Sequence, residues 1–172
     1  MNLAHQLKDF YRPTSGTPQP LNLHEAIDDM LMLKKNDFSK EHIQLTKEYV
    51  ECLPDVRVVE DQFKQVILNL LQNSNEACKK GGTLTIRTKV FNSTVVVEIE
   101  DTGHGIKQKH MEKIFDPFFT TKGEVKGTGL GLSVSYGIIK RHGGDLKVRS
   151  TEGRGTQFTI TLPINSNGED PI

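Results

Sequence analysis

The stretch from Glu60 to Lys79 restricts the possible folds of this chain most. Its apolar residues recur at helical spacing along one side, and Gly81-Gly82 follows as a stop signal, which together predict a long amphipathic helix. Such a stripe leaves water only by packing on another layer of secondary structure, so the helix must cover a sheet or further helices. The stripe consists of Phe63, Val66, Ile67, Leu70, Leu71, Ala77 and Cys78.

Alternating segments supply the second layer. Apolar residues alternate over 84–90 and again over 95–99, and Asn92-Ser93 between them is a turn signal, so a β-hairpin is predicted. A second hairpin is predicted over 146–162. Antiparallel hairpins mixed with helices favour a two-layer α/β sandwich, in which a mixed, mostly antiparallel sheet carries helices on one face. The other expected elements are a helix that starts at Leu23, a strand-like stretch over 43–49 and a helix over Gly129–His142.

The length of 172 residues fits one medium-sized domain with short appendages. Residues 1–20 are predicted to be an appendage, in which His5–Tyr11 ends a helix and Arg12–Pro20 is a linker by its Pro, Gly and Ser content. Residues 21–164 are predicted to form the folded domain, and the polar residues 165–172 a disordered tail.

Charge and cysteine content argue against several classes of protein. Lys plus Arg and Asp plus Glu both number 22, so nothing indicates the basic face that nucleic-acid binding requires. Cys52 and Cys78 lack the spacing of a disulfide scaffold or a zinc ribbon. No apolar run approaches the roughly 18 residues of a membrane span. The chain is therefore expected to be cytoplasmic and to make no membrane contact, although a longer parent protein could be membrane-anchored.

Asn69 and Asn73 lie four residues apart, on one face of the predicted long helix and beside its apolar stripe. A buried amide without a hydrogen-bond partner costs roughly 1–3 kcal/mol, so both side chains need partners. Neighbouring loops could supply them. Alternatively, the amide oxygens could face a pocket and bind a hard cation such as Mg²⁺, which prefers oxygen ligands.

A second polar cluster follows the strand that ends the first hairpin. Asp101-Thr102-Gly103-His104-Gly105-Ile106 could be a tight turn, because Asp and Gly favour turns. A fixed carboxylate at Asp101 would instead accept a hydrogen bond from the 6-amino group of adenine and reject guanine, which carries an acceptor there. The glycines would let the backbone approach a flat base.

The segment from Asp101 to Lys126 lacks a clean period, and a loop of this length inside a domain is usually functional or disordered. The phenylalanines of Ile114-Phe115-Asp116-Pro117-Phe118-Phe119-Thr120-Thr121-Lys122 could anchor it to the core. Lys122 and Lys126 could meet phosphate or remain solvated. Gly127-Thr128-Gly129-Leu130-Gly131-Leu132 then opens a helix, where free backbone amides suit an anion. This run lacks both the lysine of a Walker loop and the glycine spacing of a dinucleotide-binding fold.

The order and spacing of these segments resemble the catalytic ATP-binding domain of two-component sensor histidine kinases, over about Leu21 to Pro163. The sequence Asp-Pro-Phe-Phe-Thr-Thr-Lys at 116–122 is most similar to that of the nitrogen-regulation type of these kinases. The segments that carry the resemblance are an N box at 69–73, a first glycine box at 101–105, an F box at 115–122, a second glycine box at 127–132 and a glycine-threonine turn at 153–156.

The resemblance implies a Bergerat-type α/β sandwich that binds ATP and Mg²⁺. It implies that Asn73 and Asn69 hold the magnesium ion. It also implies that Asp101 binds the adenine amino group, with Gly105 and Thr156 close to the base.

Around the phosphates, the resemblance implies a mobile lid over 106–126 and catalytic roles for Asn69 and Lys122. Backbone amides of the second glycine box are expected to face the phosphates. The further nucleotide contacts that it implies are Gly103, Ile106, Phe118, Thr121, Lys126, Gly127, Thr128, Gly129, Leu130, Gly131 and Leu132.

Two positions depart from the family pattern. Ser74 stands in place of the usual alanine, and Glu76 stands where some members place a phosphate-binding lysine, which leaves Lys122 and Lys126 as the better candidates. Asn69 bears on the reaction, because the gyrase- and chaperone-type ATPases of this fold, and the mitochondrial-type kinases, carry a glutamate there. An amide is a poor general base near neutral pH. A phosphoryl donor is therefore expected; the alternative is an ATP-sensing module or an ATPase without phosphotransfer.

None of the six histidines matches the family's phosphoacceptor motif. His24-Glu25 lacks the proline of that motif and begins a helix of the domain itself, so a surface or helix-start role is predicted. The acceptor is expected on a separate helical hairpin, of which residues 1–12 would be the last turn. The expected partners are this dimerisation and phosphoacceptor hairpin and the receiver domain of a response regulator, and the parent is expected to be a homodimer.

Overall fold

The computed structural model describes residues 16–121 and 127–164. The predicted helix end before the linker, Lys122 and Lys126 in the lid, and the tail at 165–172 lie outside the described residues. The described elements are β1 Gln19–Leu21, α2 Leu23–Lys40, β2 Ile43–Glu48, β3 Val56–Val58, α3 Glu60–Ala77, β4 Gly82–Phe91, β5 Thr94–Asp101, a 3₁₀ turn at Gln108–His110, α4 Gly131–Arg141, β6 Asp145–Thr151 and β7 Gly155–Pro163.

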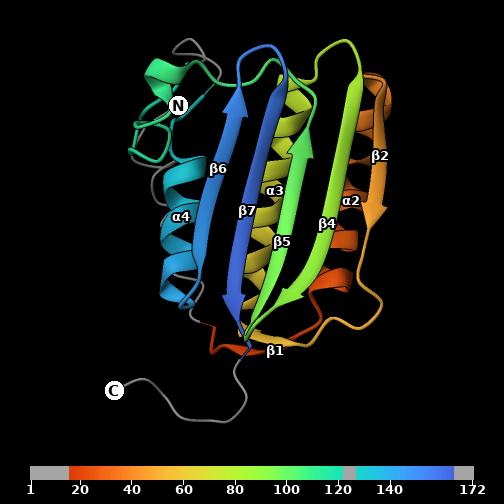
Figure 1. Ribbon diagram of the computed structural model, residues 1–172, viewed down its shortest axis with the longest axis vertical. Coiled ribbons are helices and arrows are strands. Elements are labelled where there is room, and N and C mark those ends of the chain that lie inside the picture. Colours follow the sequence, from red (N-terminus) through yellow and green to blue (C-terminus); the bar gives the residue numbers. More distant parts are fainter. Residues whose placement is uncertain (1–15, 122–126, 165–172) are drawn as a thin grey trace.

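The fold has two layers (Figure 1). The larger sheet has the strand order β2-β4-β5-β7-β6, and α2, α3 and α4 lie side by side on one of its faces. Strand β2 runs parallel to β4, whereas the other neighbours in this sheet are antiparallel. The predicted α/β sandwich with helices on one face of a mostly antiparallel sheet is therefore confirmed.

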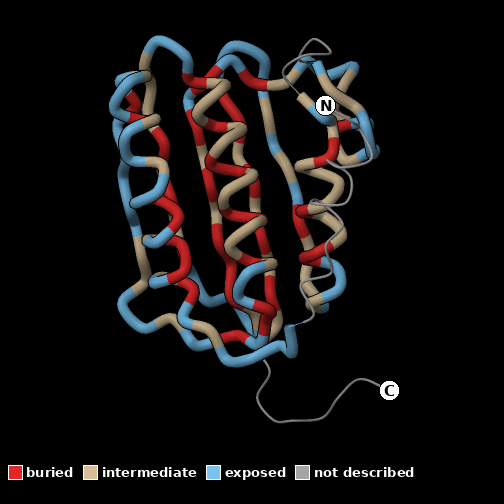
Figure 2. Tube along the Cα trace, turned by 180° about the vertical axis from the view of Figure 1, so that it is seen from behind, coloured by how far each residue is buried: buried red, intermediate tan, exposed pale blue. Residues whose placement is uncertain are grey.

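The predicted apolar stripe of α3 forms the centre of the core. Phe63, Val66, Ile67 and Leu70 are at most 1% exposed, and α3 packs between α2 and α4 while it covers the sheet. Figure 2 shows this from the helical side, with buried residues on the central helix and on the strands that it covers. Burial of one such side chain contributes roughly 1.5–3 kcal/mol, so this stripe fixes α3 on the sheet.

Both predicted hairpins are present. Strands β4 and β5 turn at Asn92-Ser93, and β6 and β7 pair from Asp145 onward. The hairpins are joined by β5 and β7, which are distant in sequence and place Asp101 directly opposite Thr156. This pairing decides which residues meet at the end of the sheet that lies uppermost in Figure 1.

Some boundaries differ from the prediction. Gln19 and Pro20, which were assigned to the linker, belong to β1, and β1 pairs with β3 in a two-stranded sheet. Three-residue strands are too short to show a period, so neither was predicted as a strand pair. Helix α3 ends at Ala77 rather than Lys79, and α4 starts at Gly131 rather than Gly129.

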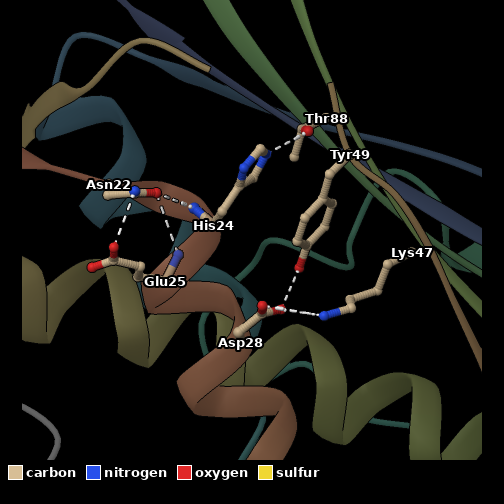
Figure 3. Close-up of polar contacts among 7 residues, drawn as sticks. All are labelled: Asn22, His24, Glu25, Asp28, Lys47, Tyr49 and Thr88. Carbon is tan, nitrogen blue, oxygen red and sulfur yellow. Dashed lines mark hydrogen bonds and ion pairs between the residues drawn. The ribbon is translucent and has the colours of Figure 1, made fainter. Parts of the chain in front are cut away.

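His24 has the predicted helix-start position. The Asn22 side chain caps α2 by accepting hydrogen bonds from the backbone N–H groups of His24 and Glu25, at 3.0 and 3.4 Å (Figure 3). The His24 ring stacks on Tyr49 with 4.2 Å between ring centroids, and its Nε2 lies 2.8 Å from the Thr88 hydroxyl. These contacts hold the start of α2 on β4 and on Tyr49, the residue that follows β2.

The Tyr49 hydroxyl extends this contact by donating to Asp28 at 2.8 Å, and Lys47 forms an ion pair with the same carboxylate (Figure 3). Partial burial lowers the pKa of His24.

Within the described ranges, no helix has both the length and the hydropathy that a membrane span requires.

Candidate functional site

The site is built around Asp101, the last residue of β5. Its side chain is 3% exposed and is held by donors from three directions. The backbone N–H of Gly103 donates to Oδ1 at 2.9 Å, the Ser74 hydroxyl donates to Oδ2 at 3.2 Å, and the backbone of Thr156 also hydrogen-bonds the carboxylate. The N box helix, the first glycine box and the glycine-threonine turn therefore meet at one buried carboxylate.

Burial also changes the acidity of this group. Desolvation raises the pKa of Asp101, because a charged carboxylate loses hydration inside the protein. The hydrogen bonds from Gly103, Ser74 and Thr156 act in the opposite direction and offset part of this rise. Asp101 is thus a fixed hydrogen-bond acceptor that protonates more readily than an exposed aspartate.

The first glycine box is clamped against the β6–β7 turn. The backbone N–H of Gly153 donates to the His104 carbonyl at 2.7 Å, and that of Ile106 donates to the Ser150 hydroxyl at 2.8 Å. Gly105 has a φ of +68°, and a Cβ atom there would lie 2.1 Å from the carbonyl oxygen of Thr151. Glycine is therefore required here by the close approach of the Thr151 backbone, and the predicted place of Gly105 beside the base stays a prediction.

Ser150 is a site residue that the sequence did not reveal. Its hydroxyl lies 2.9 Å from both the Gly155 carbonyl and the Thr156 hydroxyl, in addition to its bond with Ile106. A single serine on a strand has no sequence signal, because its role depends on what the next strand and loop bring beside it. Ser150 links Ile106 and Thr156, which were both predicted as nucleotide contacts.

A small cavity of about 190 Å³ opens beside this cluster and is lined in part by Asp101, Ser150 and Thr156. A larger open hollow of about 870 Å³ lies over β6, near Phe115 and Tyr136, and contains none of the predicted binding residues. Neither hollow is lined by residues of the N box or of the second glycine box. We therefore place the candidate site by its side chains rather than by cavity volume: it is centred on Asp101, a buried carboxylate with a raised pKa at which three of the predicted segments meet.

The N box connects to α4 through Asn69. The Asn69 side-chain Nδ2 donates to the Gly131 carbonyl and to the Ser135 hydroxyl, both at 3.2 Å. A backbone carbonyl only accepts, so the NH₂ end of the amide faces α4 and Oδ1 remains for another partner. Asn73 lies one helical turn further along the same face and is half-buried. Ser135, fully buried on α4, was not predicted as part of the site.

The second glycine box forms the entry to α4. Gly131 begins the helix, with Leu132 in its first turn, and within the described part of the chain no side chain caps the start. The backbone N–H groups of the first turn are therefore available to an anion, and the helix dipole favours negative charge there. Just before it, the Thr128 hydroxyl accepts from the Leu130 backbone at 3.4 Å, and Gly127 is half-buried.

The F box only partly anchors the loop. Phe115 and Phe119 pack on the core as expected, but Phe118 is 60% exposed and has a φ of +66°. Its backbone N–H donates to the Gly129 carbonyl at 2.9 Å, so the backbone rather than the ring ties the F box to the second glycine box. Thr121, at the end of the described segment, is exposed.

Residues 58–166 match the family described as histidine kinase-, DNA gyrase B- and HSP90-like ATPases. The chain belongs to this family. The fold is the α/β sandwich that the resemblance implied. The resemblance to sensor histidine kinases is confirmed, because the chain is homologous to members of that group. The nitrogen-regulation subtype and the roles of individual residues stay predictions.

Sensor histidine kinases are among the proteins to which this chain is similar in sequence and in structure. The chain is 36% identical to the sensor histidine kinase ZraS of Escherichia coli K12 over 169 residues, which cover 98% of this chain and 36% of ZraS. The nucleotide-free catalytic domain of histidine kinase ThkA has a TM-score of 0.77 and 33% identity, with 86% of this chain and 96% of that chain covered.

A structure of ThkA in complex with response regulator protein TrrA has a TM-score of 0.77 and 26% identity, with 94% of this chain and 46% of that chain covered. The chain spans about a third of the length of ZraS.

Proposed function

We propose that this domain binds Mg-ATP and donates the γ-phosphoryl group to a histidine on a separate dimerisation and phosphoacceptor hairpin, for relay to an aspartate of a response regulator. The observation that carries the nucleotide assignment is the buried Asp101 carboxylate, held by Ser74, Gly103 and Thr156. A fixed acceptor of this kind pairs with the 6-amino group of adenine and repels the 6-oxo group of guanine.

The phosphates are assigned to the start of α4. Gly131 and Leu132 present backbone N–H groups at the positive end of a helix, and the half-buried Gly127 and Gly129 let the preceding backbone approach closely. This arrangement binds triphosphate without a lysine from the N box helix, which agrees with Glu76 in place of the lysine that some family members carry.

Mg²⁺ is assigned to the N box. The Asn69 amide points its NH₂ end at α4, so the oxygen end is left for a ligand, and Mg²⁺ prefers oxygen donors. Asn69 and Asn73 would hold the ion, which when bound neutralises phosphate charge. Asn69 itself neither donates nor accepts a proton readily, so it does not activate water. This supports transfer to a histidine over hydrolysis.

The acceptor and partners are proposed from the relatives. The ThkA structure contains a response regulator, and by analogy we propose a receiver domain as the downstream partner here. His24 is stacked on Tyr49 and is a poor candidate acceptor. We propose that residues 21–164, together with the first residues of β1 at 19–20, form the catalytic domain of a longer homodimeric parent. We also propose that the segment before β1 connects this domain to the hairpin.

Phosphotransfer tests this proposal. The chain is incubated with γ-labelled ATP, with and without Mg²⁺ and a supplied phosphoacceptor hairpin. Acid-labile label is expected on the hairpin only when chain, Mg²⁺ and ATP are all present, and none on the chain alone. Rapid ATP hydrolysis without transfer would instead make the domain an ATPase, and binding with neither reaction would make it an ATP-sensing module.

The affinity for ATP is expected to depend on pH through Asp101. Burial raises its pKa in the folded protein, so acidification protonates the carboxylate at a higher pH than an exposed aspartate and weakens the contact with the amino group. The unfolded chain keeps the ordinary pKa, so the same protonation stabilises the free folded domain through this group. Calorimetric titrations from neutral to acidic pH should show the ATP affinity falling relative to that of a purine nucleotide with hydrogen at position 6. A constant ratio would contradict the role of Asp101.

A further inference from the structure

Ser74 directly follows the N box and is one of the two positions that depart from the family pattern, and its hydroxyl has an unusual partner. A serine within a helix commonly bonds the backbone of its own preceding turn or points to solvent. Ser74 does neither: it is 1% exposed, and its hydroxyl reaches from α3 to the Asp101 carboxylate on β5 at 3.2 Å. Leu70 and Leu71 on α3, and Cys78 directly after this helix, are buried and apolar neighbours, so Asp101 is the partner that offsets the burial of the hydroxyl.

The hydrogen bonds around Asp101 limit what else it can bind. An ionised carboxylate offers about four acceptor positions on its two oxygens. Gly103, Ser74 and Thr156 each donate to it, which leaves about one position for a ligand donor. The 6-amino group of adenine supplies one N–H in that direction. With the serine hydroxyl removed, a second position would be open, and the carboxylate could turn or take up water.

We propose that Ser74 is a positioning residue for nucleotide recognition: its hydroxyl fixes the Asp101 carboxylate so that a single acceptor position faces the 6-amino group of adenine. This inference rests on the proposed ATP-binding function and adds to it a residue that tunes base selectivity. Ser74 acts through Asp101, so its loss should matter only for ligands that carry the amino group.

The test compares two nucleotides that differ only at position 6. ATP and the purine nucleoside triphosphate with hydrogen at position 6 are titrated by calorimetry, with Mg²⁺, into the wild-type chain, Ser74→Ala and Ser74→Cys. For Ser74→Ala the affinity for ATP is expected to fall about tenfold, while that for the 6-hydrogen nucleotide stays within about twofold. Ser74→Cys keeps the size with a weaker donor, so it should give a smaller loss of the same selectivity and serves if the alanine variant does not fold.

Thr88→Val is the matched control. Thr88 is another buried hydroxyl, on β4, which bonds the His24 ring and the backbone of Val50 and does not contact Asp101. Its replacement by a side chain of similar shape should leave the ratio of the two affinities unchanged, whatever it does to the free energy of unfolding.

The outcomes are distinct. An equal loss for both nucleotides in Ser74→Ala would reduce Ser74 to a packing residue, and an unchanged affinity for ATP would remove its role; both overturn the inference while the wild-type binding of ATP upholds the proposed function. If the wild-type chain binds neither nucleotide, the proposed function fails and the inference fails with it.

Discussion

Asp101→Asn is expected to weaken ATP binding about a hundredfold, because it removes an ionised acceptor from a site surrounded by donors. An asparagine has one acceptor oxygen, for which Gly103, Ser74 and Thr156 would all compete. Its NH₂ group would then meet the amino group of adenine as a second donor. The measurement is calorimetry with ATP, ADP and GTP at neutral pH and constant Mg²⁺.

Glu98→Gln is the control for this change. Glu98 lies three residues earlier on the same strand, and its carboxylate forms an ion pair with Lys89 rather than contacting the site. The substitution removes the same charge and keeps the size of the side chain. It should therefore bind ATP as the wild type does. An Asp101→Asn protein that binds ATP within about threefold of the wild type would show that the base is bound elsewhere.

Gly155→Ala is expected to lower the free energy of unfolding by about 3 kcal/mol. Gly155 begins β7 with a φ of +118°, and a Cβ atom there would lie 1.9 Å from the carbonyl oxygen of Asp101. The obstacle is backbone, so nothing flexible can move aside. Strands β5 and β7 would have to separate where Asp101 pairs with Thr156, and the carboxylate would lose its position. Urea denaturation and ATP titration of the same samples measure both effects.

Gly153→Ala, two residues earlier in the same turn, distinguishes the cost of a positive φ from the cost of a steric clash with the backbone. Gly153 also has a positive φ, +78°, but a Cβ atom there would meet nothing within 4 Å. Only the cost of the left-handed conformation remains, about 1 kcal/mol. Binding of ATP should survive in this variant. Equal losses of stability in the two variants would mean that the close approach to Asp101 does not constrain the turn.

The long helix and both hairpins could be predicted because their signals are local. The apolar stripe of α3 and the alternation over 84–99 each report a period that depends only on residues a few positions apart. The candidate residues were also predicted, but by resemblance: their order matches the boxes of a family, and that match does not depend on knowing the contacts.

The short strands and the exposed Phe118 could not be predicted. Strands β1 and β3 have three residues each and are defined by their pairing with one another. The F box sequence indicated that phenylalanines could anchor the loop, but not which of them do so; Phe118 has a positive φ and is exposed. Both features depend on how distant segments pack, which a local pattern does not record.

The sequence by itself determined the layers of this domain and the residue types of its site: a carboxylate, two amides and glycine-rich turns. Only the tertiary structure decided their pairing, since Ser74 meets Asp101 across 27 positions and Asn69 meets Ser135 across 66. The register of β5 on β7 then sets Thr156 beside that carboxylate. The physical reason is that a hydrogen bond needs two groups within about 3 Å at the right angle. For residues so far apart in the chain, only the packing of helix on sheet creates that geometry.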